Sequence, residues 1–166
     1  MRIEDIKKLW IDFLVEQGFT HAITMKPNDR DFLYTLGKLH NLFVKVHMLV
    51  DRHLLGRRFN TASRAGLRSQ AVGIVEGLPF SGHLHGAFRI APANWAAFER
   101  LFADDVGVKR SGIWRKLVPS GSAVVERIGD PEGWHDYTFK NVWETGDLDR
   151  VVLLPLASAE STITPK

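Results

Sequence analysis

The sequence contains no cysteine, and this absence excludes both a disulfide framework and any metal site built on thiolates. No apolar run approaches the roughly 18 to 20 residues that a membrane-spanning helix needs. Charged side chains interrupt residues 1–17 repeatedly, which argues against a secretory signal. We therefore expect a cytoplasmic protein with no membrane partner.

The sequence lacks a nucleotide-binding loop but contains an arginine cluster that could bind phosphates. No Gly-x-x-x-x-Gly-Lys-Ser/Thr loop occurs, so we expect no nucleotide cofactor and no fused helicase. By contrast, the stretch from Arg52 to Arg68 holds five arginines and lacks any acidic side chain. Such a cluster suits a phosphate backbone, and a solvated loop kept for solubility is the alternative.

The hydrophobic pattern predicts one α+β domain with a mainly antiparallel central sheet and flanking helices, spanning residues 1–156. Residues 1–18 form its N-terminal helix, and residues 157–166 form a polar tail. Further helices are expected over 29–55, capped by Asn28, and over 92–102 and 131–143. Strands are expected over 21–25, 71–76, 83–90, 123–128 and 151–156, whereas 57–69 is expected to be irregular and 108–121 has no clear assignment.

The segment His83-Leu84-His85 is a candidate metal-ligand pair, because alternation along a strand points both imidazoles to one face. Glu76 ends the preceding strand and stands opposite His83 if the two strands pair across their six-residue link. Two imidazole nitrogens and one carboxylate oxygen form a site for a divalent cation with open positions, for which Mn²⁺ or Mg²⁺ suits catalysis. A pair of surface histidines on a strand is the alternative.

A candidate nucleophile follows in the helix expected to begin at Pro131. Tyr137 and Lys140 are three residues apart and therefore share a helix face. A phenol is a weak nucleophile at neutral pH. It becomes useful only when a cation lies beside it and a bound metal ion has reduced the negative charge of the group that it attacks. A packed aromatic ring next to a solvated lysine is the alternative.

In this order along the chain, the three motifs resemble those of the HUH endonucleases, and most closely the replication-initiator proteins that begin rolling-circle replication. The resemblance covers His-Ala-Ile-Thr-Met at 21–25, His-Leu-His with Glu76, and Tyr-Thr-Phe-Lys at 137–140. It implies a ferredoxin-like or RNA-recognition-type fold. It also implies Glu76, His83 and His85 as metal ligands, Tyr137 as the nucleophile, Lys140 as its accompanying lysine, and a structural role for Thr24.

The implied activity is metal-dependent nicking and joining of single-stranded DNA through a 5′-phosphotyrosine. The implied partners are single-stranded DNA or an origin hairpin, together with a host helicase. Alternatives are a single-tyrosine transposase of the same superfamily, a non-catalytic DNA-binding module, and a cupin-like metal enzyme. The residues expected to hold DNA phosphates are Arg57, Arg58, Arg64, Arg68, Arg110, Arg115 and Lys116, and Trp114 is the tryptophan most suited to stacking on bases.

Overall fold

A computed structural model describes residues 2–29, 33–104 and 111–155 of the chain. Its helices are α1 (Ile3–Glu16), α2 (Leu36–Leu55), α3 (Trp95–Phe102), α4 (Ile113–Leu117) and α5 (Pro131–Thr145). Its strands are β1 (His21–Lys26), β2 (Gln70–Glu76), β3 (His83–Arg89), β4 (Ser122–Arg127) and β5 (Val151–Leu154). Short 3-10 helices cover Ala62–Leu67, Pro92–Asn94 and Leu148–Arg150. None of the described helices is both long and apolar enough to cross a membrane.

The five strands form one sheet in the order β4-β1-β3-β2-β5, and every neighbouring pair is antiparallel. The connection from β1 to β2 through α2 skips β3, and the connection from β3 to β4 through α3 and α4 skips β1. The connection from β4 to β5 through α5 crosses the whole sheet. This topology is consistent with a ferredoxin-like or RRM-like arrangement. The predicted α+β class with a mainly antiparallel sheet and flanking helices is confirmed.

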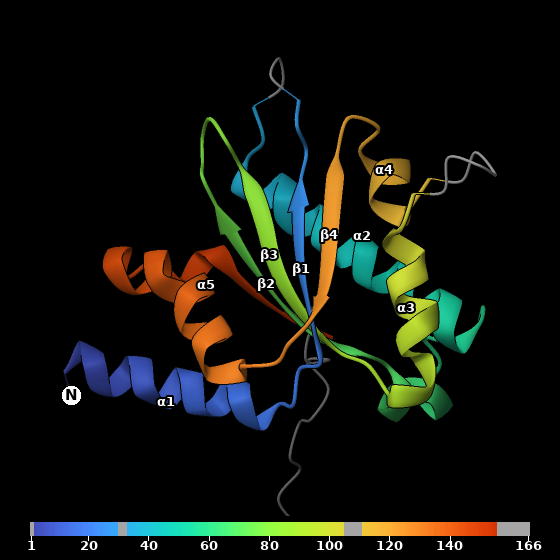
Figure 1. Cartoon of the computed structure of the whole chain (residues 1–166), viewed down its shortest axis with the longest axis horizontal. Helices are drawn as coiled ribbons and strands as arrows, with labels where there is room; N and C mark the ends of the chain where they lie inside the picture. Colours follow the sequence, from blue (N-terminus) through green and yellow to red (C-terminus); the bar gives the residue numbers. More distant parts are fainter. Residues whose placement is uncertain (1, 30–32, 105–110, 156–166) are drawn as a thin grey trace, which may run out of the picture.

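Helices cover both faces of the sheet (Figure 1). On one face, Phe43 of α2 packs with Phe98 of α3 and Trp114 of α4 in the larger core. On the other face, Leu14 of α1 and Phe139 of α5 form a second core with side chains of β2 and β3. Strand alternation supplies both cores, since successive side chains point to opposite faces.

The second face is covered only in part. The helices α1 and α5 contact each other, and α5 contacts β2, at the β5 side of the sheet (Figure 1). Over β4, by contrast, Val124 is 56% exposed although its neighbours Ala123 and Val125 pack into the larger core. The β4 edge of this face is therefore an open surface beside the helices.

The second helix begins later than the sequence predicted. Its first residue is Leu36 and not Asp29, because Thr35 caps it by accepting a hydrogen bond from the Lys38 backbone N–H at 3.2 Å. The expected cap, Asn28, instead has a left-handed backbone (φ 56°) and donates from its side chain to Ser122 Oγ at 2.9 Å. Residues 30–32 lie outside the described part of the chain.

The 57–69 segment and the unassigned stretch also contain helices. Residues Ala62–Leu67 form a 3-10 helix where an irregular connection was expected, and Ile113–Leu117 forms α4. Trp114 within α4 is 1% exposed and donates its indole N–H to the Lys26 carbonyl at 3.0 Å. The sequence favours core positions for the tryptophans, with Trp114 as the best exception for base stacking; that exception was wrong, because its ring fills the core.

Candidate metal centre and neighbouring tyrosine

The hairpin of β2 and β3 brings three candidate metal ligands onto one face. Glu76 pairs directly with His83 in the strand register, and Ile74 pairs with His85. The intervening Leu84 is fully buried in the larger core, so His83 and His85 both point to the opposite face, the one that carries α5. The predicted pairing of Glu76 with His83 across the six-residue link is confirmed.

The ligand atoms of this group lie close enough together to reach one ion. Glu76 Oε2 lies 3.4 Å from His85 Nε2 and 3.6 Å from His83 Nε2. One ligand atom from each of the three residues falls within 4.8 Å of the other two. Metal–ligand bonds of about 2.1 Å at roughly tetrahedral or octahedral angles separate neighbouring ligands by about 3 to 3.5 Å. Glu76, His83 and His85, which we call the metal cluster, could thus hold a metal ion.

The orientation of both rings and the protonation of His85 favour a cation between the rings and the carboxylate. His83 donates Nδ1–H to the Ser81 carbonyl at 2.9 Å, so Nε2 is the ring nitrogen that faces Glu76. Burial lowers the pKa of His85 to about 4, helped by the charges of His83, Lys26 and Lys140. His85 is therefore neutral at physiological pH, the form in which imidazole binds metals.

The buried carboxylate gives a second reason to expect a ligand. Glu76 is 7% exposed, and its Oε1 is buried without a hydrogen-bond partner among the described residues. A buried, unpaired carboxylate oxygen is costly, and a bound cation removes that cost. The chemistry of the donors, two imidazoles and one carboxylate, fits a divalent metal ion.

Thr24 supports the metal cluster from β1, as its implied structural role requires. Its hydroxyl lies 3.1 Å from His85 Nδ1, opposite in the β1–β3 register, and so orients the ring whose Nε2 faces Glu76. We expect Thr24→Val to lower cation affinity by about 10- to 100-fold without unfolding the protein, because partners of this kind fix ring tautomer and orientation. Calorimetric titration with Mn²⁺ measures the change.

The matched control is Thr24→Ser, which keeps the hydroxyl and is expected to restore most of the affinity. Equal affinities for the wild-type, valine and serine proteins would show that Thr24 does not orient His85.

Tyr137 lies over the metal cluster on the exposed side of α5. The helix begins at Pro131, and the Asp130 side chain caps it by accepting from the Gly133 backbone N–H at 3.1 Å. The Tyr137 ring is 60% exposed, and its centroid lies 6.5 Å from that of His85. The Lys140 ammonium is 4.7 Å from the centre of the Tyr137 ring, so the predicted shared face exists.

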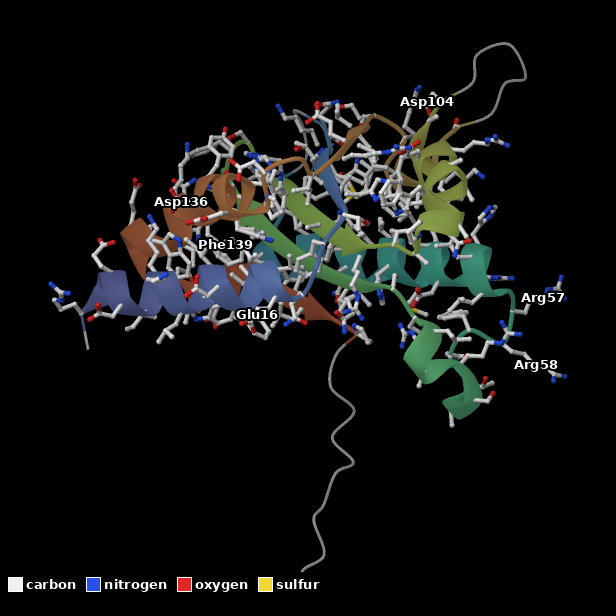
Figure 2. All side chains as sticks on the ribbon, turned by 60° about the horizontal axis from the view of Figure 1, so that its bottom comes forward. Glu16, Arg57, Arg58, Asp104, Asp136 and Phe139 are labelled. Carbon is white, nitrogen blue, oxygen red and sulfur yellow. The ribbon has the colours of Figure 1, made fainter. Side chains whose placement is uncertain are left out.

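The residues before Tyr137 hold α5 in place and point away from the metal cluster. Asp136, labelled in Figure 2, pairs with Lys7 of α1 at 2.6 Å, and His135 is fully buried against Phe19 and Trp134. Adjacent helix positions diverge by about 100°. The helix carrying Tyr137 is thereby anchored to α1 on its inner side.

His135 should make the fold sensitive to acid. Its ring nitrogens have no partner among the described residues, and burial lowers its pKa from 6.5 to about 4. Because the unfolded chain binds this proton more readily, stability is lost as pH falls from about 6.5 to about 4, by up to about 3 kcal/mol. We expect His135→Leu to flatten this dependence in urea unfolding measured between pH 7 and pH 4.

His53 is exposed on α2, so His53→Leu provides a matched loss of one imidazole and should leave the pH dependence unchanged. An unaltered acid slope in His135→Leu would exclude the buried ring as its source.

The predicted phosphate-binding arginines lie apart from the metal cluster. Figure 2 shows Arg57 and Arg58 at the far end of the molecule from Asp136 of α5. They follow α2 and precede β2, whose first residue Gln70 is six strand positions, or about 20 Å, from Glu76. DNA held by both regions would have to run along the molecule.

Several of these cations already have protein partners. Arg68 binds the buried Asp51 carboxylate at 2.7 Å, Arg64 donates to the Leu55 carbonyl at 2.9 Å, and Arg115 pairs with Asp104 at 3.2 Å. Lys116 is exposed on α4, and Arg110 lies outside the described residues. DNA binding by these seven residues stays a prediction.

The sequence motifs did not point to two residues that lie near the site, Phe80 and Lys26. Phe80, in the turn before His83, is 88% exposed, and Lys26 ends β1 close enough to influence the pKa of His85. An aromatic residue in a turn rich in glycine and proline, directly ahead of a ligand histidine, was the available clue to Phe80. Lys26 becomes a neighbour only through the pairing of β1 with β3.

No family model, no curated protein and no solved structure matches this chain. An assignment of activity therefore rests on the residues of the site itself.

Proposed function

We propose that this protein is a metal-dependent endonuclease that nicks and rejoins single-stranded DNA with Tyr137 as nucleophile, initiating rolling-circle replication as in the HUH endonucleases it resembles. One observation carries the proposal: the ring of Tyr137 lies 6.5 Å from that of His85, a member of the metal cluster. Tyr137 and His85 come from distant parts of the sequence, and the fold brings them together on one side of the sheet.

The chemistry is a phosphoryl transfer to the tyrosine. Tyr137 Oη loses its proton and forms a bond to the scissile phosphorus, the bond from phosphorus to the 3′-oxygen breaks, and that oxygen takes up a proton. The products are a free 3′-hydroxyl and a 5′-phosphotyrosine that preserves the bond for rejoining. A divalent cation at Glu76, His83 and His85, Mn²⁺ or Mg²⁺, supplies neutralisation of phosphate charge. Lys140 stabilises the phenolate electrostatically.

The shape of the surface supports a single-stranded substrate. His85 pairs with Thr24 of β1, which pairs in turn with the exposed Val124 of β4, so the metal cluster is one strand away from the open β4 edge. A flexible single strand can follow such a surface with its backbone against the metal cluster, whereas a duplex buries its bases in pairs and stacks.

The rival functions are less well supported by the same residues. A cupin-like site would need a glutamate downstream of the histidines, but Glu99 binds Arg127 at 2.7 Å and His21 at 3.3 Å, on the opposite face. A single-tyrosine transposase commonly has glutamine four residues after its tyrosine, where this chain has Asn141. A non-catalytic DNA-binding module would not require Tyr137 beside the metal cluster.

Covalent trapping tests the proposal. The protein is mixed with Mn²⁺ and a labelled pool of random-sequence single strands, denatured in detergent and separated by electrophoresis. We expect a retarded protein band carrying the 3′ portion of the DNA, and a much weaker band with the same pool made double-stranded. Absence of any adduct across the single-stranded pool would favour the non-catalytic module.

A further inference from the structure

A hollow of about 600 Å³ opens at the end of the sheet, directly beside the metal cluster. Its walls are residues 26–29 at the end of β1 and just after it, Tyr34 before α2, and residues 79–83 of the β2–β3 turn and the start of β3. His83 belongs to both the hollow and the metal cluster. A group bound in the hollow would thus lie next to a phosphate bound at the metal cluster. Its volume falls within the range of about 300 to 1,000 Å³ typical of small-ligand sites.

The hollow carries aromatic side chains suited to a flat ring. Phe80 is 88% exposed, so it contributes little to the core, while Tyr34 is half-buried on the opposite loop. The exposed Lys26 adds a positive charge at the same end of β1. Aromatic rings beside a cation are the usual means of holding single-stranded nucleic acid, through base stacking and phosphate attraction.

The turn that presents Phe80 is ordered by its own hydrogen bonds. Ser81 donates its backbone N–H to the Gly77 carbonyl at 2.8 Å, and the Ser81 carbonyl accepts from His83 Nδ1 at 2.9 Å. Gly77 has φ 71°, and a Cβ there would collide with the Ser81 carbonyl. Since one turn both orients His83 and displays Phe80, the hollow and the metal cluster keep a fixed relative position.

We propose that this hollow receives the nucleobase immediately 5′ of the scissile phosphate, with Phe80 as a stacking surface. The inference rests on the proposed function. In an in-line displacement, the leaving 3′-oxygen departs on the side opposite the attacking oxygen. Tyr137 lies against His85, whereas the hollow is lined by His83 and by neither His85 nor Tyr137. The nucleotide that keeps the 3′-hydroxyl therefore lies towards the hollow.

Abasic scanning of one substrate locates the bound base. An intact single strand that is shown to form adduct is resynthesised with a single abasic site at each position in turn, on both sides of the nick. For the wild-type protein, we expect the largest fall in adduct formation at the position 5′ of the nick, by about 5- to 100-fold, as befits the loss of one stacked base.

The Phe80→Ala variant tests whether the turn makes this contact. On the intact oligonucleotide, this variant should form adduct about as slowly as the wild type does on the oligonucleotide that is abasic 5′ of the nick. Introducing that abasic site should slow the variant little further. Phe80→Trp should retain the wild-type pattern. Leu67→Ala, at a 63% exposed position in the 3-10 helix Ala62–Leu67, is the control for losing an exposed apolar side chain and should behave as wild type.

Failure of the inference and failure of the proposed function give different results. If adduct forms but the abasic scan is the same for wild type and Phe80→Ala, the inference is overturned and the nicking activity stands. If no adduct forms, fluorescence anisotropy with labelled oligothymidylate decides. Weaker binding by Phe80→Ala, but not by Leu67→Ala, would retain the hollow as a base site without nicking, and equal binding by all three proteins would overturn both.

Discussion

Tyr137→Phe is expected to abolish the covalent protein–DNA adduct, a loss of about four orders of magnitude or more in rate, as is typical when a nucleophile is removed. The substitution deletes only the phenolic oxygen. The ring is 60% exposed, and its hydroxyl makes no hydrogen bond within the described residues, so stability should be unchanged. Adduct formation is measured on denaturing gels, and single-strand binding by fluorescence anisotropy should survive.

Tyr34→Phe is the matched control, since Tyr34 is the only other tyrosine in the sequence. It should still form the adduct. If Tyr137→Phe still formed the adduct and Tyr34→Phe did not, Tyr34 would be the nucleophile, and the proposed role of Tyr137 would be wrong.

The second large effect concerns the cation. Replacing both His83 and His85 by alanine removes two of the three candidate ligands. The affinity for Mn²⁺ should therefore fall by far more than the roughly 10- to 100-fold expected when a residue that only orients a ligand is lost. The side chains are 22% and 14% exposed at one end of the sheet, whereas the buried Leu84 between them is retained. The fold should therefore persist, as judged by circular dichroism, while calorimetry registers no cation binding.

A double alanine variant of His40 and His53 on α2 controls for the general loss of two imidazoles. It should bind Mn²⁺ as the wild type does. Undiminished affinity for Mn²⁺ in the variant lacking His83 and His85 would show that the metal cluster does not bind the ion.

The part of the site that the sequence predicted is the part built locally. Glu76 and His83 are joined by a short turn, so strand alternation and direct pairing sufficed to place them on one face. The shared face of Tyr137 and Lys140 likewise followed from helix geometry alone. Both relationships depend on residues close together in the chain.

The failed or incomplete predictions involve partners distant in the sequence. Asn28 was expected to cap a helix, but pairing of β1 with β4 brings Ser122 within reach of its side chain. The segment from Arg52 to Arg68 contains no acidic residue, yet Arg68 forms an ion pair with Asp51 of α2, one position before that segment. Trp114 has cationic neighbours in sequence but is buried by α2 and α3 in the larger core. No local pattern encodes these contacts.

Because residues 76–85 supply all three metal-cluster side chains, while Tyr137 sits on a helix tied to α1 through Lys7 and Asp136, the two halves of the site can fail independently. A preparation in which α5 has come loose would still take up its full complement of Mn²⁺. Metal content would then overstate the fraction of working molecules. Active-site titration should instead count the DNA fragments captured per protein chain.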